Sequence, residues 1–133
     1  MVTKTEQLPH AEGFIVSEAN GALSREQVTI KSGSAILYPG TVLGVRDDGK
    51  YEALDPDSSE GNDAARAILC SEVDPTAGDA KGVVIERLAE VREDDLQWPD
   101  GISTAEQDAA VAQLLTHNIK VRSGPSTVTT QTT

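Results

Sequence analysis

Residues 41–54 read Thr-Val-Leu-Gly-Val-Arg-Asp-Asp-Gly-Lys-Tyr-Glu-Ala-Leu, which places two mainly apolar segments on either side of a polar centre. The Asp48-Gly49 pair in that centre is a strong short-range signal for a β-hairpin, because glycine accepts the positive φ that a tight turn needs. We therefore expect residues 41–45 and 51–54 to form two strands that pair antiparallel.

Immediately before the hairpin, Pro39 and Gly40 have the residue order of a type II turn. Proline presets φ at the second position of such a turn, and glycine accepts positive φ at the third. We expect both residues to be structural and to direct the chain into the first strand of the hairpin.

Further strands are indicated on both sides of this centre. Apolar and polar residues alternate over 27–31, which predicts a half-buried strand, and the apolar run within 64–73 predicts a buried one. Another strand is expected to begin at Val83 and to continue to about Val91, and residues 119–122 alternate again. The fold class that follows is mainly β.

One segment predicts a helix. Ser103 and Glu106 have the spacing of a capping box, in which each side chain satisfies a backbone N–H near the helix start. Asn118 is the expected left-handed stop. The predicted apolar face of this helix consists of Ala105, Ala109, Val111, Ala112, Leu114 and Leu115. The predicted class is therefore mainly β (α+β) with one C-terminal α-helix.

Size and charge limit the possible functions. The chain has 133 residues, of which 38% are hydrophobic and 3% aromatic, so we expect one domain with a modest aliphatic core. A thin core favours oligomerisation. The formal net charge of -11 removes the basic surface that nucleic-acid binding needs, so no nucleic-acid partner is expected.

Cysteine usage and the N-terminus point to a soluble product. Cys70 is the single cysteine, so no internal disulfide is possible, and its apolar neighbours favour a buried thiol. Residues 1–10 lack the apolar core of a signal peptide, and no run is long enough to span a bilayer. We expect no membrane partner and synthesis in the cytoplasm.

Catalytic and metal-binding patterns are missing from the sequence. His10 carries no motif, and His117 is expected to cap the helix as a cation near its C-terminus. The acidic residues 55–63 lack the spacing of a calcium loop, and the glycines form no phosphate-binding motif, so a solvated loop is favoured. We expect no enzyme activity, no metal and no cofactor.

Trp98-Pro99 has two possible roles, a sugar-stacking platform or a packing anchor. Pro99 favours an extended backbone before it, which would hold the indole of Trp98 at the end of its segment. In a protein with so few aromatic residues, burial of that indole would stabilise the core by roughly a few kcal/mol. The packing anchor is the favoured interpretation.

Four pieces of the chain, taken in order, carry a family resemblance. They are Phe14-Ile15-Val16-Ser17-Glu18-Ala19-Asn20-Gly21, then Ser24-Arg25-Glu26, then Pro39-Gly40-Thr41-Val42-Leu43-Gly44, and finally Trp98-Pro99 before a helix rich in Ala and Gln. In this succession, over nearly all of residues 13–122, the chain resembles the head decoration proteins of tailed phages.

The resemblance implies a small β-clip-like domain that forms a homotrimer and binds the major capsid protein on the outer surface of the expanded phage head. The implied positions are the three-fold and quasi-three-fold sites, and the implied role is to stabilise the head against the pressure of packaged DNA. It places the protein on the virion, and in the host cytoplasm during assembly.

The resemblance also implies an extended capsid-binding arm (1–21) and a β-rich domain (22–122), while composition sets off a Thr-rich tail (123–133) that has no counterpart in the family. In the family the arm adds to the sheet of the capsid protein, so we interpret the corresponding segment here as lying outside the core. The expected capsid-binding residues are Gly13, Phe14, Ile15, Val16, Ser17 and Glu18.

Two alternatives from other classes remain open. One is a virion-surface module that binds polysaccharide, for which Trp98 would be the stacking residue. The other is a trimeric nucleotide hydrolase, because β-clip folds also carry that activity and a fold alone says little about function.

Overall fold

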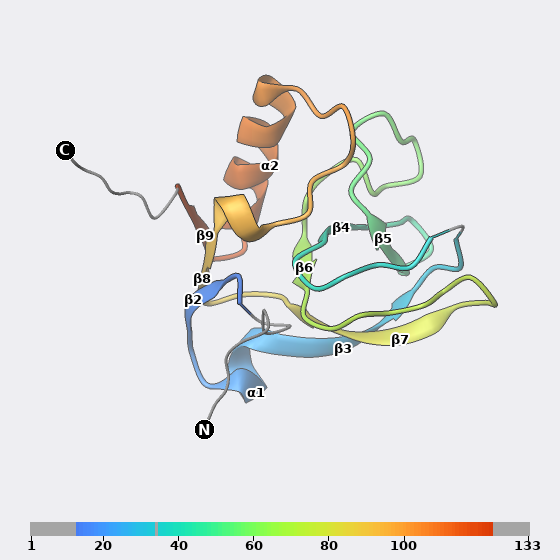
Figure 1. The fold of residues 1–133 in the computed structure, drawn as a ribbon, viewed down its shortest axis with the longest axis horizontal. Helices are drawn as coiled ribbons and strands as arrows, with labels where there is room; N and C mark the ends of the chain where they lie inside the picture. Colours follow the sequence, from blue (N-terminus) through green and yellow to red (C-terminus); the bar gives the residue numbers. More distant parts are fainter. Residues whose placement is uncertain (1–12, 34, 124–133) are drawn as a thin grey trace.

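Five short strands close into a barrel at one end of the molecule (Figure 1). The computed structural model describes residues 13–33 and 35–123, apart from the side chains of Gly21 and Ala22. Around the barrel the order is β3 (Arg25–Ile30), β5 (Tyr51–Ala53), β4 (Val42–Val45), β6 (Ala67–Leu69) and β7 (Ala80–Ile85). The hairpin predicted from residues 41–54 is β4–β5, with Val45 opposite Tyr51, and it forms one side of this barrel.

The turns that begin and close this hairpin have the predicted geometry. The N–H of Thr41 donates to the carbonyl of Tyr38 across Pro39 and Gly40 (3.1 Å), and Gly40 has a φ of 93°. In the hairpin loop Gly49 has a φ of 87°. Both glycines occupy the left-handed region that other residues adopt only with strain.

A three-stranded sheet lies beside the barrel, in the order β2 (Ile15–Glu18), β8 (Ala89–Arg92) and β9 (Ile119–Arg122). β2 and β8 are antiparallel, whereas β8 and β9 are parallel. A parallel pair needs a long crossover, which the 3-10 helix η1 (Glu93–Asp95) and the helix α2 (Thr104–Leu115) provide (Figure 1). The prediction of a mainly β domain with a C-terminal helix is confirmed.

The predicted strand from Val83 to Val91 is in fact two strands. β7 ends at Ile85 in the barrel and β8 begins at Ala89 in the sheet, and between them Leu88 has a φ of 58°. The chain changes sheets where the sequence changes from apolar residues to Glu86 and Arg87.

Two other elements differ from the prediction. Only Ala67–Leu69 of the predicted strand 64–73 forms β6, and the short helix α1 (Gly21–Ser24) lies outside the predicted elements.

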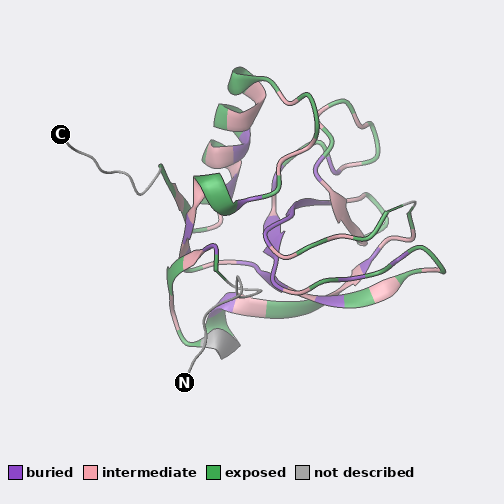
Figure 2. Ribbon diagram, viewed as in Figure 1, coloured by how far each residue is buried: buried purple, intermediate pink, exposed green. Residues whose placement is uncertain are grey.

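Neighbouring residues of the same strand belong to two separate cores. Side chains alternate along a strand, so Leu43, Leu69 and Val84 fill the barrel interior together with Ile30, Ala67 and Val73. The preceding or following residues, Val42, Ile68 and Ile85, face a second core between the barrel, the sheet and α2. As a result, consecutive residues of one strand are buried, as in β4 and β6. Figure 2 shows these buried stretches.

Helix α2 begins with the capping box expected from Ser103 and Glu106. The Oγ of Ser103 accepts from the N–H of Glu106 (3.1 Å), and the Glu106 carboxylate accepts from the N–H of Ser103 (3.0 Å). Asn118 has the predicted left-handed backbone, with a φ of 62°. The predicted apolar face is partly wrong, because the buried residues are Ala110 and Leu114, and Leu115 is 54% exposed.

Candidate functional site

Strand β2 has a free edge. It pairs with β8 through Ile15 opposite Val91, Ser17 opposite Glu90 and Glu18 opposite Ala89. Within residues 13–33 and 35–123 no strand pairs with its other side. An unpaired edge presents a row of N–H and C=O groups that another extended chain can join. The free edge of β2 is therefore the candidate site.

Phe14 corrects one part of the sequence interpretation. Its side chain is 3% exposed and belongs to the core between the barrel, the sheet and α2, and its carbonyl accepts from the N–H of Arg92 (2.8 Å). The interpretation that the segment 13–18 lies outside the core is therefore wrong for Phe14. Phe14 packs inside its own domain and is not available to enter a pocket on a partner.

Val16 is the apolar side chain that β2 presents to solvent, with 42% of its surface exposed. The register of β2 on β8 shifts between Ile15 and Ser17, which marks Val16 as the extra residue of a β-bulge. Gly13 and Ser17 are exposed as well, whereas Ile15 packs partly against the core. The outer surface of β2 thus combines one exposed apolar side chain with free backbone groups.

Glu18, the last residue of β2, makes polar contacts with Ser24 and Arg25. Its carboxylate accepts from Nη2 and Nε of Arg25, at 2.6 and 3.1 Å, and from the Oγ of Ser24 at 2.5 Å. The hydrogen bond from Arg25 is the largest cause that holds the pKa of Glu18 below its usual value. The side chain expected to contact a partner is therefore engaged within the chain.

The backbone of Gln97 links the predicted turn at Pro39-Gly40 to the segment that contains Trp98. Its N–H donates to the carbonyl of Gly40 (2.8 Å), which brings the turn at 39–40 beside the segment that leads into α2. Trp98 is partly buried against the core, and its Nε1 donates to the carbonyl of Glu93 (3.3 Å). An indole packed in this way supports the fold and is a poor sugar platform.

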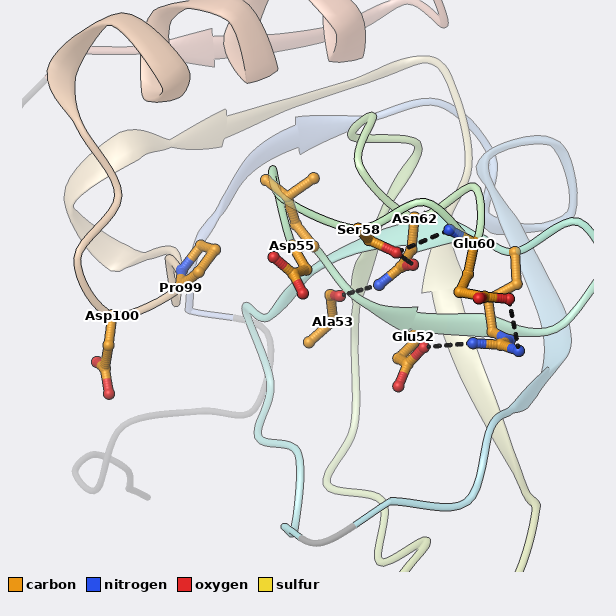
Figure 3. Close-up of a pocket in the computed structure, with 10 residues that line it drawn as sticks. Glu52, Ala53, Asp55, Ser58, Glu60, Asn62, Pro99 and Asp100 are labelled. Carbon is orange, nitrogen blue, oxygen red and sulfur yellow. Dashed lines mark hydrogen bonds and ion pairs between the residues drawn. The ribbon is translucent and has the colours of Figure 1, made fainter.

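A hollow of about 570 Å³ lies between the loop 55–63 and Pro99-Asp100 (Figure 3). Several of its polar groups bind one another. Arg46 contacts Glu52 at 3.0 Å and Glu60 at 3.7 Å, and the buried Asn62 accepts from Ser58 at 2.6 Å. Within the described ranges, no cluster of three or more His, Cys, Asp or Glu side chains could hold a metal ion. The contacts among Arg46, Glu52, Glu60, Ser58 and Asn62 hold the loop in place, and the carboxylate of Asp100 also lines the hollow.

His117 differs from the sequence interpretation. Burial, and then the nearby positive charge of Arg66, lower the pKa of His117 below its usual value. A lowered pKa favours the neutral imidazole and so disfavours the cationic helix cap expected from the sequence. The described helices also include none that is long and apolar enough to cross a membrane.

A buried polar cluster was missed by the sequence reasoning. Glu86 is 4% exposed and binds both Arg66 (2.8 Å) and the hydroxyl of Tyr51 (2.5 Å). These residues are separated by 20 and 35 positions, and the only available signal was a glutamate directly after the apolar residues 83–85. The cluster links three strands of the barrel, since Tyr51 lies in β5, Arg66 directly precedes β6 and Glu86 directly follows β7.

Comparison with known proteins agrees with the resemblance. The family model described as bacteriophage lambda head decoration protein D matches residues 3–119, which include β2, the barrel and α2. No curated protein matches the chain. The family model covers well over half of the chain, and the chain therefore belongs to the bacteriophage lambda head decoration protein D family.

Proposed function

We propose that this protein is a capsid cement that binds the outer surface of the expanded phage head as a homotrimer and stabilises it against packaged DNA. The observation that carries the proposal is the free edge of β2 in a member of the head decoration family. The proposed partner is the major capsid protein at three-fold and quasi-three-fold positions, and the proposed location is the virion surface, after assembly in the host cytoplasm.

The binding mode that we propose is strand addition. A strand of the capsid protein pairs with the outer edge of β2 and extends the sheet β2-β8-β9 by one strand. Main-chain hydrogen bonds supply the pairing, and the exposed Val16 supplies an apolar contact. Phe14 contributes indirectly, because its burial fixes the start of β2 on the domain.

Trimerisation raises the strength of this contact. A short strand with one apolar side chain binds weakly, since much of the contact energy is offset by the loss of freedom on association. Three linked edges make the second and third contacts intramolecular, which raises the overall affinity by about 10² to 10⁴. Preference for the expanded head follows if only that shell places three acceptor strands at the matching separation.

Co-sedimentation with purified heads tests the proposal. The protein is mixed with expanded heads and with unexpanded heads, and bound protein is measured after pelleting, while analytical ultracentrifugation gives the mass of the free protein. We expect a trimer that pellets with expanded heads only. A monomer that stays in the supernatant with both kinds of head would contradict the proposal.

The polysaccharide-binding alternative has no specific observation in its favour. Trp98, which a sugar platform needs on the surface, packs against the core and binds the carbonyl of Glu93. The hollow in Figure 3 is lined mainly by acidic and small residues and has no aromatic side chain. Strand addition to a capsid lattice therefore remains the single proposed function.

A further inference from the structure

Between β2 and β3 the chain passes from the three-stranded sheet to the barrel, and a polar contact lies at this connection. β2 ends at Glu18 in the three-stranded sheet, and β3 begins at Arg25 in the barrel. Nη2 and Nε of Arg25 both donate to the Glu18 carboxylate, at 2.6 and 3.1 Å. A two-bonded arginine contact of this kind fixes direction as well as distance.

Ser24 connects this contact to the rest of the domain. Its side chain is fully buried, and its Oγ donates to Glu18 at 2.5 Å. Its carbonyl accepts from the N–H of Glu86 at 2.8 Å, and its own N–H donates to the carbonyl of Asn20 at 3.1 Å. One buried serine thus joins the end of β2, the turn after it and the segment between β7 and β8.

The backbone pairing of β2 is too short to hold the strand by itself. The strand has four residues, and a bulge at Val16 interrupts its register on β8. Phe14 anchors the start of the strand in the core. At the other end the N–H of Ala19 donates to the carbonyl of Leu88 (3.0 Å), and the side chain of Glu18 anchors the strand through Ser24 and Arg25.

We propose that Glu18 is a positioning residue, which binds Ser24 and Arg25 so that β2 is held on β8 with its outer edge formed before a capsid strand arrives. This inference rests on the proposed function. It changes the role expected for Glu18, because both carboxylate oxygens already have partners within the chain. Glu18 therefore affects binding of the capsid protein indirectly, because it keeps β2 in place on β8.

The physical consequence is a population effect. A ligand that binds one conformation has an apparent dissociation constant equal to the intrinsic value divided by the populated fraction. If the contact at Glu18 is lost, β2 leaves its register part of the time and the competent fraction falls. Binding then weakens although the protein remains folded, whereas a residue that affects only global stability leaves binding unchanged far below the melting temperature.

The test compares three variants of the full-length protein with the wild type. Glu18→Gln removes the charge and keeps the shape, and the double variant Glu18→Arg with Arg25→Glu restores an ion pair in reverse. Asp79→Asn is the matched control. It removes a carboxylate that pairs with Lys50 at 2.6 Å and accepts from the N–H of Ser32, on the barrel and away from β2.

Two measurements are made on each variant at a temperature well below melting. Amide hydrogen exchange of residues 13–24 reports the order of β2 without any partner, and co-sedimentation with expanded heads reports binding. We expect Glu18→Gln to exchange faster in this segment and to bind heads on the order of tenfold more weakly. The reversed pair should recover most of both losses, and Asp79→Asn should show neither.

Different failures have different meanings. Unchanged exchange in Glu18→Gln, or binding equal to that of the wild type, overturns the positioning role and leaves the proposed function in place. Equal weakening in Asp79→Asn also overturns it, because the effect would then be general. If wild-type protein does not bind heads, the proposed function fails, and the positioning role fails with it even where exchange of β2 increases.

Discussion

The carboxylate of Glu86 lies 2.8 Å from the guanidinium of Arg66, and these two residues form an ion pair in which the acid is buried and the base reaches the surface. The side chain of Glu86 is 5% exposed and that of Arg66 is 28% exposed. A buried charge without its partner is strongly unfavourable, whereas a partly exposed charge can be solvated. The two halves of the pair should therefore respond differently to mutation.

We predict that Arg66→Ala destabilises the protein more than Glu86→Gln. The first change removes the nearest cation from a buried carboxylate, which keeps only the Tyr51 hydroxyl and Arg87 at 3.9 Å, and breaking such a buried pair costs up to about 3 to 5 kcal/mol. The second leaves a neutral amide in place of the carboxylate and a guanidinium that water can reach. Urea unfolding followed by circular dichroism gives both free energies, and an equal loss in the two variants would argue against a buried pair.

Phe14 and Val16 should separate stability from binding. Phe14→Ala opens a cavity in the core and is expected to lower the free energy of unfolding by about 3 to 5 kcal/mol. Val16→Asp changes an exposed side chain at the free edge, so the melting temperature should stay nearly constant while head binding weakens. The pair of melting curves and co-sedimentation assays checks this. A stable Phe14→Ala protein would contradict the observed burial.

Gly82 is a packing position inside the barrel. A Cβ there would lie 2.9 Å from Cγ2 of Val73 and 3.2 Å from side-chain atoms of Ile30 and Leu69. We predict that Gly82→Ala destabilises the protein by about 1 to 3 kcal/mol through overpacking. Gly33→Ala is the control, since its Cβ would have no neighbour closer than 4.0 Å. Thermal unfolding of the two variants should differ clearly.

Acid should weaken the protein partly through Glu18. Its pKa in the fold is lower than the ordinary value of 4.5, so the unfolded chain binds more protons between the two values. The stabilising contribution is complete above the unfolded pKa and is lost as the pH falls through the folded pKa. Between about pH 5 and pH 2, unfolding free energies of Glu18→Gln should therefore depend less on pH than those of the wild type. Parallel curves for the two proteins would count against the contact with Arg25.

His117 should contribute in a higher range of pH. Its pKa in the fold is lowered from 6.5, so folding favours the neutral imidazole and stability falls as the pH drops through and below about 6.5. His117→Gln should reduce this dependence between about pH 7 and pH 5. A proton NMR titration of the His117 ring measures the pKa directly, and a value above 6.5 would restore the cationic cap predicted from the sequence.

Several features were predictable because they depend on residues close together in the chain. The turn at Pro39-Gly40, the hairpin at Asp48-Gly49 and the capping box at Ser103 and Glu106 each need only a few neighbouring side chains and backbone groups. Local steric and hydrogen-bonding rules determine such features. The ordered pieces that carry the family resemblance are also present in the sequence alone, and the family model confirms them.

Other features depended on which distant segments pack together. Phe14 belongs to a core that includes β8, β9 and α2, and the buried face of α2 passes through Ala110 because that side meets the sheet. Alanines all around the helix hid this face, and one apolar run from residue 83 hid the change of sheet at Leu88. Sequence alone therefore determined the local turns, the helix cap and the family. The tertiary structure decided that β2 is part of the domain and that, among residues 13–33 and 35–123, one of its edges is free, because burial and strand pairing depend on contacts between segments far apart in the chain.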